Sequence, residues 1–256
     1  MKTRIALAQI HIVFGNPEAN LAAAEAMILA ASDSDATWIQ LPELWSSGYD
    51  LTRLSAISEA NTAILSHLQQ VSTAQNIWIS GSYAVAAGNS YANRYITLSP
   101  DNTDYPGYDK LHLFGLMKED RHFSQGAAPI IQPLPFGKTG LSICYDLRFP
   151  ELYRHYSAHS ALLLANCAEW PAARVEHWRA LSTARAIENQ AWFAGVNAVG
   201  KTGKETFAGR SRVLTPWGEI AAEASPSEPE LVVAEIDTAE ADEIRRQYPF
   251  LQDRRM

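Results

Sequence analysis

Cysteine is scarce in this sequence, which has only Cys144 and Cys167 among its 256 residues. Two cysteines are too few for a disulfide framework or a cluster of thiolate metal ligands, so at least one thiol is free for other chemistry. A run of about 18 apolar residues, the length that spans a membrane, is also missing. The start, MKTRIALAQIHIVFG, is not expected to be a signal peptide, because Gln9 and His11 interrupt its apolar run and no small-residue cleavage site follows. We therefore expect a cytoplasmic protein.

Blocks of like charge are absent as well. The formal net charge of −7 comes from scattered acidic residues rather than from a tail. Such a distribution favours solubility and argues against partners such as nucleic acid or an anionic membrane. Hydrophobic residues make up 47% of the chain, which is ample for a buried core. No internal repeat or low-complexity linker divides the chain, so we expect one domain over residues 1–256.

Apolar runs typical of buried strands recur along the chain, with amphipathic helical patterns between several of them. One helix is expected to begin at Asn16-Pro17, a capping residue followed by a proline at the first helical position. Strand follows strand at 77–98 and 211–236, so the sequence predicts an α/β fold with mixed sheets. The expected strands cover residues 4–10, 37–41, 77–85, 92–98, 139–144, 160–165, 191–198, 211–214 and 231–236.

Three helical patterns are clear, and each has apolar residues at helical spacing. The first helix carries Leu21, Ala24, Ile28 and Ala31, the second carries Ile64, Leu65, Leu68 and Val71, and the third, over residues 175–189, carries Trp178, Leu181, Ala184 and Ile187.

Cys144 lies at the end of an apolar strand. The polar residues YDLR follow it, and Pro150 then begins a predicted helix. The thiol is therefore expected on a strand-to-helix turn, where catalytic residues often lie. There the backbone N–H of Tyr145 can face a developing oxyanion. The alternative is a buried structural cysteine, and position alone does not decide between the two.

Two charged residues occur in unusual surroundings. Glu43, in LPELWSSGYDL, follows the strand at 37–41, and the carboxyl ends of strands in α/β sheets usually face the ligand site. Lys110, in YDKLHLFG, stands among aromatic and apolar residues, which is costly for a charge unless a partner is present. The alternatives are an exposed loop acid and a surface lysine.

Together these segments resemble the carbon-nitrogen hydrolase (nitrilase) superfamily. The resemblance extends over almost the whole chain and rests on the sequence motifs ALAQI, LPEL, YDKLHLF, CYDLRFPELYR, LSTARAIENQ and GRSRVLTPWGE. It implies a four-layer α-β-β-α sandwich with mixed sheets, which pairs across a helical face into a homodimer. It also implies that Glu43 is the general base, Lys110 the electrostatic stabiliser and Cys144 the nucleophile. A second glutamate of the family matches Glu119, whose alternative is a solvated loop acid.

Within that superfamily, YDKLHLFG, CYDLRFPE and ARAIENQ look most similar to the omega-amidase branch, whose members hydrolyse the terminal amide of short 2-oxo acids such as 2-oxoglutaramate. The implied activity is a thiol-dependent amidohydrolase that acts through a thioester and releases ammonia. Where relatives often read Ala-Asn-Trp-Pro, this chain departs and reads Asn166-Cys167-Ala168-Glu169-Trp170-Pro171. Alternatives are action on a nitrile, a carbamoyl amine or another amide, acyl transfer, or a scaffold without turnover.

An anionic substrate end needs a cation or backbone donors, and Arg174, just after Trp170-Pro171, is our candidate; a surface ion pair is the alternative. Aromatic side chains at Trp45, Tyr49, Phe114 and Trp170 are candidates for shaping the pocket, although aromatic residues are more often simply core. We expect structural ion pairs from Arg148, Glu151, Arg185 and Glu188.

We expect no cofactor and no metal. His112, His122, Glu119 and Asp120 are potential ligands, but their spacing fits no standard zinc motif and thioester chemistry needs no metal. A last helix is expected near 238–247, and the tail PFLQDRRM is expected to reach across a dimer, with a frayed terminus as the alternative.

Overall fold

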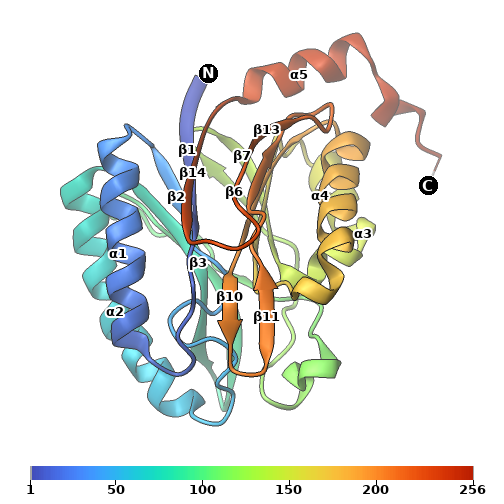
Figure 1. Ribbon diagram of the computed structural model, residues 1–256. Helices are drawn as coiled ribbons and strands as arrows, with labels where there is room; N and C mark the ends of the chain where they lie inside the picture. Colours follow the sequence, from blue (N-terminus) through green and yellow to red (C-terminus); the bar gives the residue numbers. More distant parts are fainter. Residues whose placement is uncertain (1, 256) are drawn as a thin grey trace.

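The computed structural model describes residues 2–255, and two six-stranded sheets form its central layers (Figure 1). The first sheet has the order β14-β1-β2-β3-β4-β5 and the second the order β13-β12-β9-β8-β7-β6. In each sheet three central strands are parallel and the remaining neighbours are antiparallel. The first sheet comprises β1 (Lys2–Gln9), β2 (Trp38–Gln40), β3 (Trp78–Ala87), β4 (Ser90–Leu98), β5 (Tyr108–Asp109) and β14 (Glu230–Asp237).

The second sheet comprises β6 (Ile131–Leu134), β7 (Gly137–Ile143), β8 (Leu163–Ala168), β9 (Trp192–Asn197), β12 (Arg212–Leu214) and β13 (Ile220–Glu223). A separate hairpin is formed by β10 (Val199–Thr202) and β11 (Glu205–Ala208).

Helices cover the outer faces of both sheets (Figure 1). α1 (Pro17–Asp33) and α2 (Leu54–Gln75) lie against the first sheet, and α3 (Pro150–Ala158) and α4 (Val175–Asn189) against the second. α5 (Thr238–Gln247) follows β14 near the C-terminus, and short 3₁₀ helices occur at Gly115–Met117, Glu119–Arg121, Cys144–Arg148, Ala172–Arg174 and Phe250–Asp253. The predicted α-β-β-α sandwich with mixed sheets is confirmed.

Successive side chains of β1 point to opposite faces of the sheet, and each face packs in a different core. Ile5 and Leu7 belong to the core between the sheets, whereas Ala6 and Ala8 pack in a second core with Ala24 and other residues of α1 and α2. Small residues on the outer face let the helix approach the strand closely, and large ones fill the space between the sheets. The same sequence therefore specifies two hydrophobic layers.

Local signals set several helix ends as predicted. Asn16 Oδ1 accepts a hydrogen bond of 3.1 Å from Ala19 N, and Pro17 opens α1. Pro150 opens α3, and the predicted third helix coincides with α4. No helix within residues 2–255 is long and apolar enough to cross a membrane.

Two expectations about elements are wrong in detail, and five short strands are missing from the prediction. The strand expected at 160–165 is β8, which begins at Leu163, because α3 ends at Ala158 and a turn over residues 159–160 precedes the strand. The pattern on α4 does not describe a buried face, since Ile187 is 49% exposed while Ser182 and Arg185 are buried. The short strands β5, β6, β10, β11 and β13 were not predicted, because each depends on a partner strand rather than on its own apolar run.

Candidate active site

Cys144 stands at the end of a strand in a strained backbone conformation. β7 ends at Ile143, and Cys144 begins a 3₁₀ helix with a φ of 41°. Positive φ is rare for residues other than glycine and persists where the surrounding structure enforces it, often at functional sites. The predicted strand-to-helix turn is therefore confirmed. Tyr145 lies in the first turn of this helix, where backbone N–H groups lack partners inside the helix.

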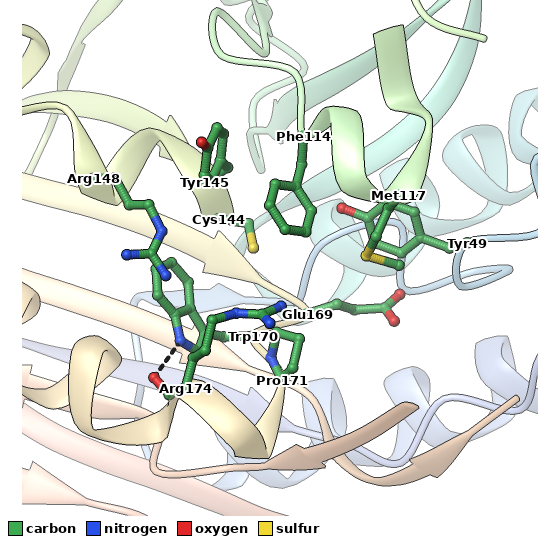
Figure 2. Close-up of a pocket in the computed structure, with 10 residues that line it drawn as sticks. All are labelled: Tyr49, Phe114, Met117, Cys144, Tyr145, Arg148, Glu169, Trp170, Pro171 and Arg174. Carbon is green, nitrogen blue, oxygen red and sulfur yellow. Dashed lines mark hydrogen bonds between the residues drawn. The ribbon is translucent and has the colours of Figure 1, made fainter. Parts of the chain in front are cut away.

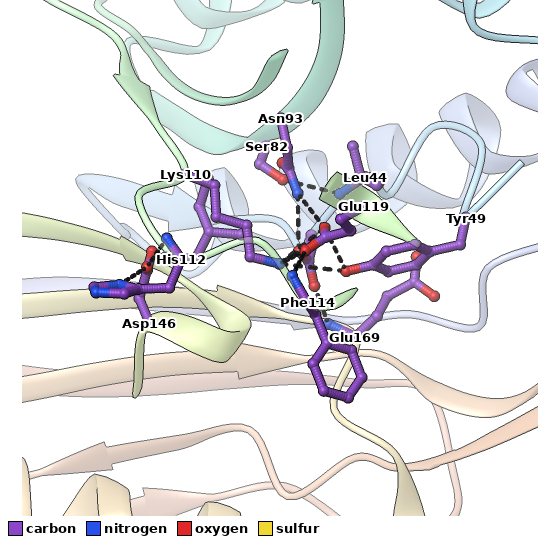
Figure 3. A network of polar contacts seen from close by, with 12 residues as sticks. Leu44, Tyr49, Ser82, Asn93, Lys110, His112, Phe114, Glu119, Asp146 and Glu169 are labelled. Carbon is purple, nitrogen blue, oxygen red and sulfur yellow. Dashed lines mark hydrogen bonds and ion pairs between the residues drawn. The ribbon is translucent and has the colours of Figure 1, made fainter. Parts of the chain in front are cut away.

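Asp146 holds this turn against the segment that carries Lys110 (Figure 3). Its carboxylate accepts hydrogen bonds from Ile143 N at 2.9 Å and from Tyr108 OH at 2.7 Å. It also accepts from His112 N at 3.0 Å and lies 2.7 Å from His112 Nδ1. Because Tyr108 and His112 flank Lys110, Asp146 fixes the position of the nucleophile relative to the lysine.

A buried cluster of one amine and two carboxylates lies beside the turn (Figure 3). Lys110 Nζ is 2.7 Å from Glu43 Oε1 and 2.7 Å from Glu119 Oε2, and all three side chains are completely buried. Tyr49 OH donates to Glu119 Oε1 at 3.1 Å, and Phe114 N donates to Glu119 Oε2 at 2.6 Å. The lysine therefore has the partners that its apolar surroundings require.

Glu43 follows β2 and is held by two further donors. Asn93 Nδ2, from β4, donates to Glu43 Oε1 at 2.9 Å, and Glu169 N, after β8, donates to Glu43 Oε2 at 3.2 Å. Strand ends from both sheets therefore meet at one carboxylate, which agrees with the position of ligand sites in α/β proteins.

The charges of the cluster set its resting protonation. Burial alone would lower the pKa of Lys110, but Glu119 and Glu43 outweigh burial and raise the pKa well above its ordinary value, so the amine stays charged. Burial raises the pKa of Glu119, which shares this one cation with Glu43. Burial also raises the pKa of the Cys144 thiol well above its ordinary value, and the charge of Glu43 adds to the rise. The resting thiol is therefore protonated, and its activation requires a base.

Cys144 is 8% exposed and borders a narrow cavity of about 20 Å³ (Figure 2). A cavity of this size holds one or two water molecules. The Arg174 guanidinium lies 5.6 Å from the Phe114 ring centroid, and the Arg148 guanidinium lies 4.8 Å from that of Trp170. The lining residues are Tyr49, Phe114, Met117, Cys144, Tyr145, Arg148, Glu169, Trp170, Pro171 and Arg174. The four residues predicted for substrate binding, Tyr49, Phe114, Trp170 and Arg174, are all among them.

Two predictions about neighbouring residues are wrong. Arg148 forms no ion pair within residues 2–255 and lines the cavity instead, and exposed Glu151 pairs with no cation in the same range. Trp45 does not shape the pocket, because it is fully buried and packs edge-on against Tyr83 in the outer core. The expected pair of Arg185 and Glu188 is confirmed at 2.8 Å.

Three residues of the site were not predicted. In the sequence Asn93 is only a polar residue within a predicted strand, and Asp146 is marked only by its place in the CYDLR motif. Glu169 has a signal in the sequence, because it belongs to the segment that departs from Ala-Asn-Trp-Pro. Within residues 2–255 no group of three or more His, Cys, Asp and Glu side chains is arranged to hold a metal ion.

Comparison with known proteins places this geometry in a family. The family model for carbon-nitrogen hydrolases matches residues 4–246. A 2-oxoglutaramate amidase of Bacillus subtilis (strain 168) is 37% identical over 255 residues, which cover 99% of this chain and 98% of that protein.

Solved structures agree with this placement. A carbon-nitrogen hydrolase superfamily protein from Xanthomonas campestris, with an arsenic adduct in its active site, matches with a TM-score of 0.93 at 26% identity and covers 100% of this chain and 98% of its own. A mutant of the amidase from Nesterenkonia sp. AN1 matches with a TM-score of 0.88 at 26% identity, covering 99% and 94% of the two chains; it shows covalent addition of the acetamide moiety of fluoroacetamide at the active site cysteine. From the family match and these similarities over nearly its whole length, the chain belongs to the carbon-nitrogen hydrolase family.

Proposed function

We propose that this protein is a thiol-dependent amidohydrolase that releases ammonia from the terminal amide of a small 2-oxo or other carboxylate-bearing amide, as an omega-amidase does. The observation that carries the proposal is the position of Cys144 on a strained turn beside the buried cluster of Glu43, Lys110 and Glu119. The name of the B. subtilis relative, 2-oxoglutaramate amidase, supports the choice of substrate.

The first half of the reaction forms a thioester. Glu43 takes the thiol proton, and the Cys144 sulfur attacks the carbonyl carbon of the amide. The oxygen becomes an oxyanion, stabilised by the charge of Lys110 and by the N–H of Tyr145. When the C–N bond breaks, Glu43 returns the proton to the nitrogen, and ammonia leaves.

The second half regenerates the thiol. Glu43 removes a proton from a water molecule that attacks the thioester carbon, and the same proton then returns to the departing sulfur. Glu119 acts as a positioning residue through its two contacts with Lys110, at 2.9 and 2.7 Å. Because each step moves one proton within the cluster, the buried charge of the site changes little during the cycle.

The cavity offers cations for the substrate carboxylate. Arg148 and Arg174 line it, and neither forms an ion pair with an acid in the part of the chain that the structure describes. An unpaired guanidinium is well suited to bind a carboxylate through two parallel hydrogen bonds. Tyr49, Phe114 and Trp170 supply apolar walls for the carbon chain.

The proposal extends to a homodimer in the cytoplasm. An apolar surface is formed by partly exposed side chains of α4, the turn before β13, the start of β13 and the segment after α5, and a second copy would bury it. Trp217 packs edge-on against Tyr248 and Phe250 lies tilted against it, with centroid distances of 5.1 and 5.9 Å. Both cysteines are free, which suits a reducing compartment. The residues of this surface are Ile187, Trp217, Ile220, Tyr248 and Phe250; Met256 of the tail lies outside the described residues.

Ammonia release from a panel of amides tests the function. We expect turnover of 2-oxoglutaramate by the wild type, no turnover by Cys144→Ala, and retained turnover by the matched variant Cys167→Ala, whose thiol is buried in β8. Turnover of a nitrile or a carbamoyl amine in place of every amide would contradict the assigned bond. Loss of activity in Cys167→Ala but not in Cys144→Ala would contradict the assigned nucleophile.

A further inference from the structure

Glu169 has a buried carboxyl group that the mechanism above does not use. The side chain is 2% exposed, and its Oε1 atom has no hydrogen-bond partner within residues 2–255. Only its backbone N–H contributes to the cluster, by donating to Glu43. A buried polar atom without a partner is energetically costly, so such an atom in a pocket wall points to a ligand.

The carboxyl of Glu169 lies in the wall of the Cys144 cavity (Figure 2). Figure 2 shows it directed toward Tyr49 and Met117, on the side of the cavity away from Arg148. The same three residues, Tyr49, Met117 and Glu169, also line a second cavity of about 150 Å³. A substrate attached to Cys144 therefore has the Glu169 carboxyl beside its acyl chain.

The surroundings of Glu169 favour its neutral form. The cluster already holds the carboxylates of Glu43 and Glu119 against one lysine, which bonds both of them. Burial, and then the charge of Glu43, raise the pKa of Glu169 well above its ordinary value. A protonated carboxyl has an O–H to donate, and its natural partner is an oxygen acceptor.

The charge of the cavity argues against a cationic partner. Arg148 and Arg174 line the same small space without acidic partners, so an ammonium group on the acyl chain would meet two positive charges. A neutral oxygen meets no such repulsion. The acyl chain is thereby expected to carry an oxygen rather than an amine where it passes Glu169.

We propose that Glu169 is a specificity-determining residue whose carboxyl donates a hydrogen bond to an oxo or hydroxyl oxygen on the acyl chain of the amide substrate. The inference rests on the proposed function, because it requires the acyl chain of an amide in the Cys144 cavity. It adds to that function a reason why the site selects an oxygen-bearing acyl chain over a plain hydrocarbon chain.

The test compares 2-oxoglutaramate with its analogue that has a methylene in place of the oxo group. In Glu169→Leu we expect kcat/KM for 2-oxoglutaramate to fall by about 10- to 100-fold, the usual effect of losing one buried hydrogen bond, and kcat/KM for the analogue to change little. Glu169→Gln keeps an N–H donor and should retain most of the preference. The matched control is Glu176→Leu, the same change at a glutamate whose side chain is 75% exposed.

Binding of both amides to Cys144→Ala, measured by calorimetry, separates this inference from the proposed function. Tighter binding of the oxo amide to Cys144→Ala, lost in the double variant with Glu169→Leu, supports the inference. If the wild type releases no ammonia, only the proposed hydrolysis is contradicted, and the binding result still supports the inference. Equal losses for both amides in Glu169→Leu, or no preference in the parent protein, overturn the inference. If neither amide binds, the inference and the proposed substrate are both wrong.

Discussion

Asp146 holds His112 through two hydrogen bonds, at 3.0 Å from the backbone N–H and at 2.7 Å from ring Nδ1. His112 lies two residues after Lys110, and Asp146 lies two residues after Cys144. The pair therefore joins the nucleophile turn of one sheet to the lysine segment of the other. The ring of His112 also stacks on Phe149, with centroids 3.7 Å apart, which limits its movement.

Asp146→Asn should lower kcat by about 10- to 100-fold while the fold persists, because an amide group cannot accept all the hydrogen bonds that the carboxylate accepts and the two reacting groups lose their alignment. Steady-state kinetics with 2-oxoglutaramate, together with circular dichroism, measures this. Asp242→Asn, on the exposed side of α5, is the control. Wild-type kcat in Asp146→Asn would contradict the positioning role.

Lys110→Met should destabilise the protein by about 3–5 kcal/mol at neutral pH, since it leaves the buried carboxylates of Glu43 and Glu119 without their cation. The pKa of Glu119, already raised by burial, should rise further. A carboxyl with a raised folded-state pKa favours the fold while it is protonated, so the deficit of the variant should shrink as the pH falls. Urea unfolding at several pH values measures this, and a deficit that does not vary with pH would contradict it.

Glu169 should make stability depend on pH. Burial first, and Glu43 second, raise its pKa well above 4.5, so the folded state binds this proton more tightly than the unfolded state does. The stabilisation is complete below the unfolded-state pKa and is lost as the pH rises through the folded-state pKa.

The comparison variant for that prediction is Glu169→Gln, which has no proton to lose. As the pH rises, the unfolding free energy of Glu169→Gln should increase relative to that of the wild type. The expected increase is about 1.4 kcal/mol for each pH unit between the unfolded-state and folded-state pKa values of Glu169. Denaturant titrations at pH values from about 5 to 8 measure the difference. A constant difference over this range would show that Glu169 is ionised throughout.

Ile187→Glu should convert the proposed homodimer to a monomer, because it places a charge in the apolar surface of α4, where Ile187 is 49% exposed. Light scattering after size-exclusion chromatography measures the mass. Leu29→Glu, at a residue of α1 that is 40% exposed, is the matched control and should leave the mass unchanged. A monomeric wild type would contradict the proposed interface.

The sequence predicts the features that depend on local chemistry. Pro17 and Pro150 open helices, and the change from apolar to polar letters at Cys144 marks the end of a strand. The resemblance to a family adds the four layers and the residues Glu43, Lys110 and Cys144, which the structure brings to one place.

Features that depend on distant contacts were not predicted. Asn93 and Glu43 are 50 residues apart and meet only because β4 and β2 share a sheet. Arg148 resembles a partner for nearby acids in the sequence, yet the fold turns it onto Trp170. Ile187 fits the apolar pattern of α4 but is 49% exposed, because a helical period marks an apolar position without showing what covers it.

The most direct test of the account is the mass of the Cys144 peptide after rapid quenching with 2-oxoglutaramate. Glu43→Gln, which lacks the base that activates the thiol, is quenched beside the wild type as the control and should carry no adduct. The account predicts that the acyl group, without its nitrogen, is attached to Cys144 and is absent from Cys167. Release of ammonia without any such adduct, or an adduct on Cys167 alone, would contradict it.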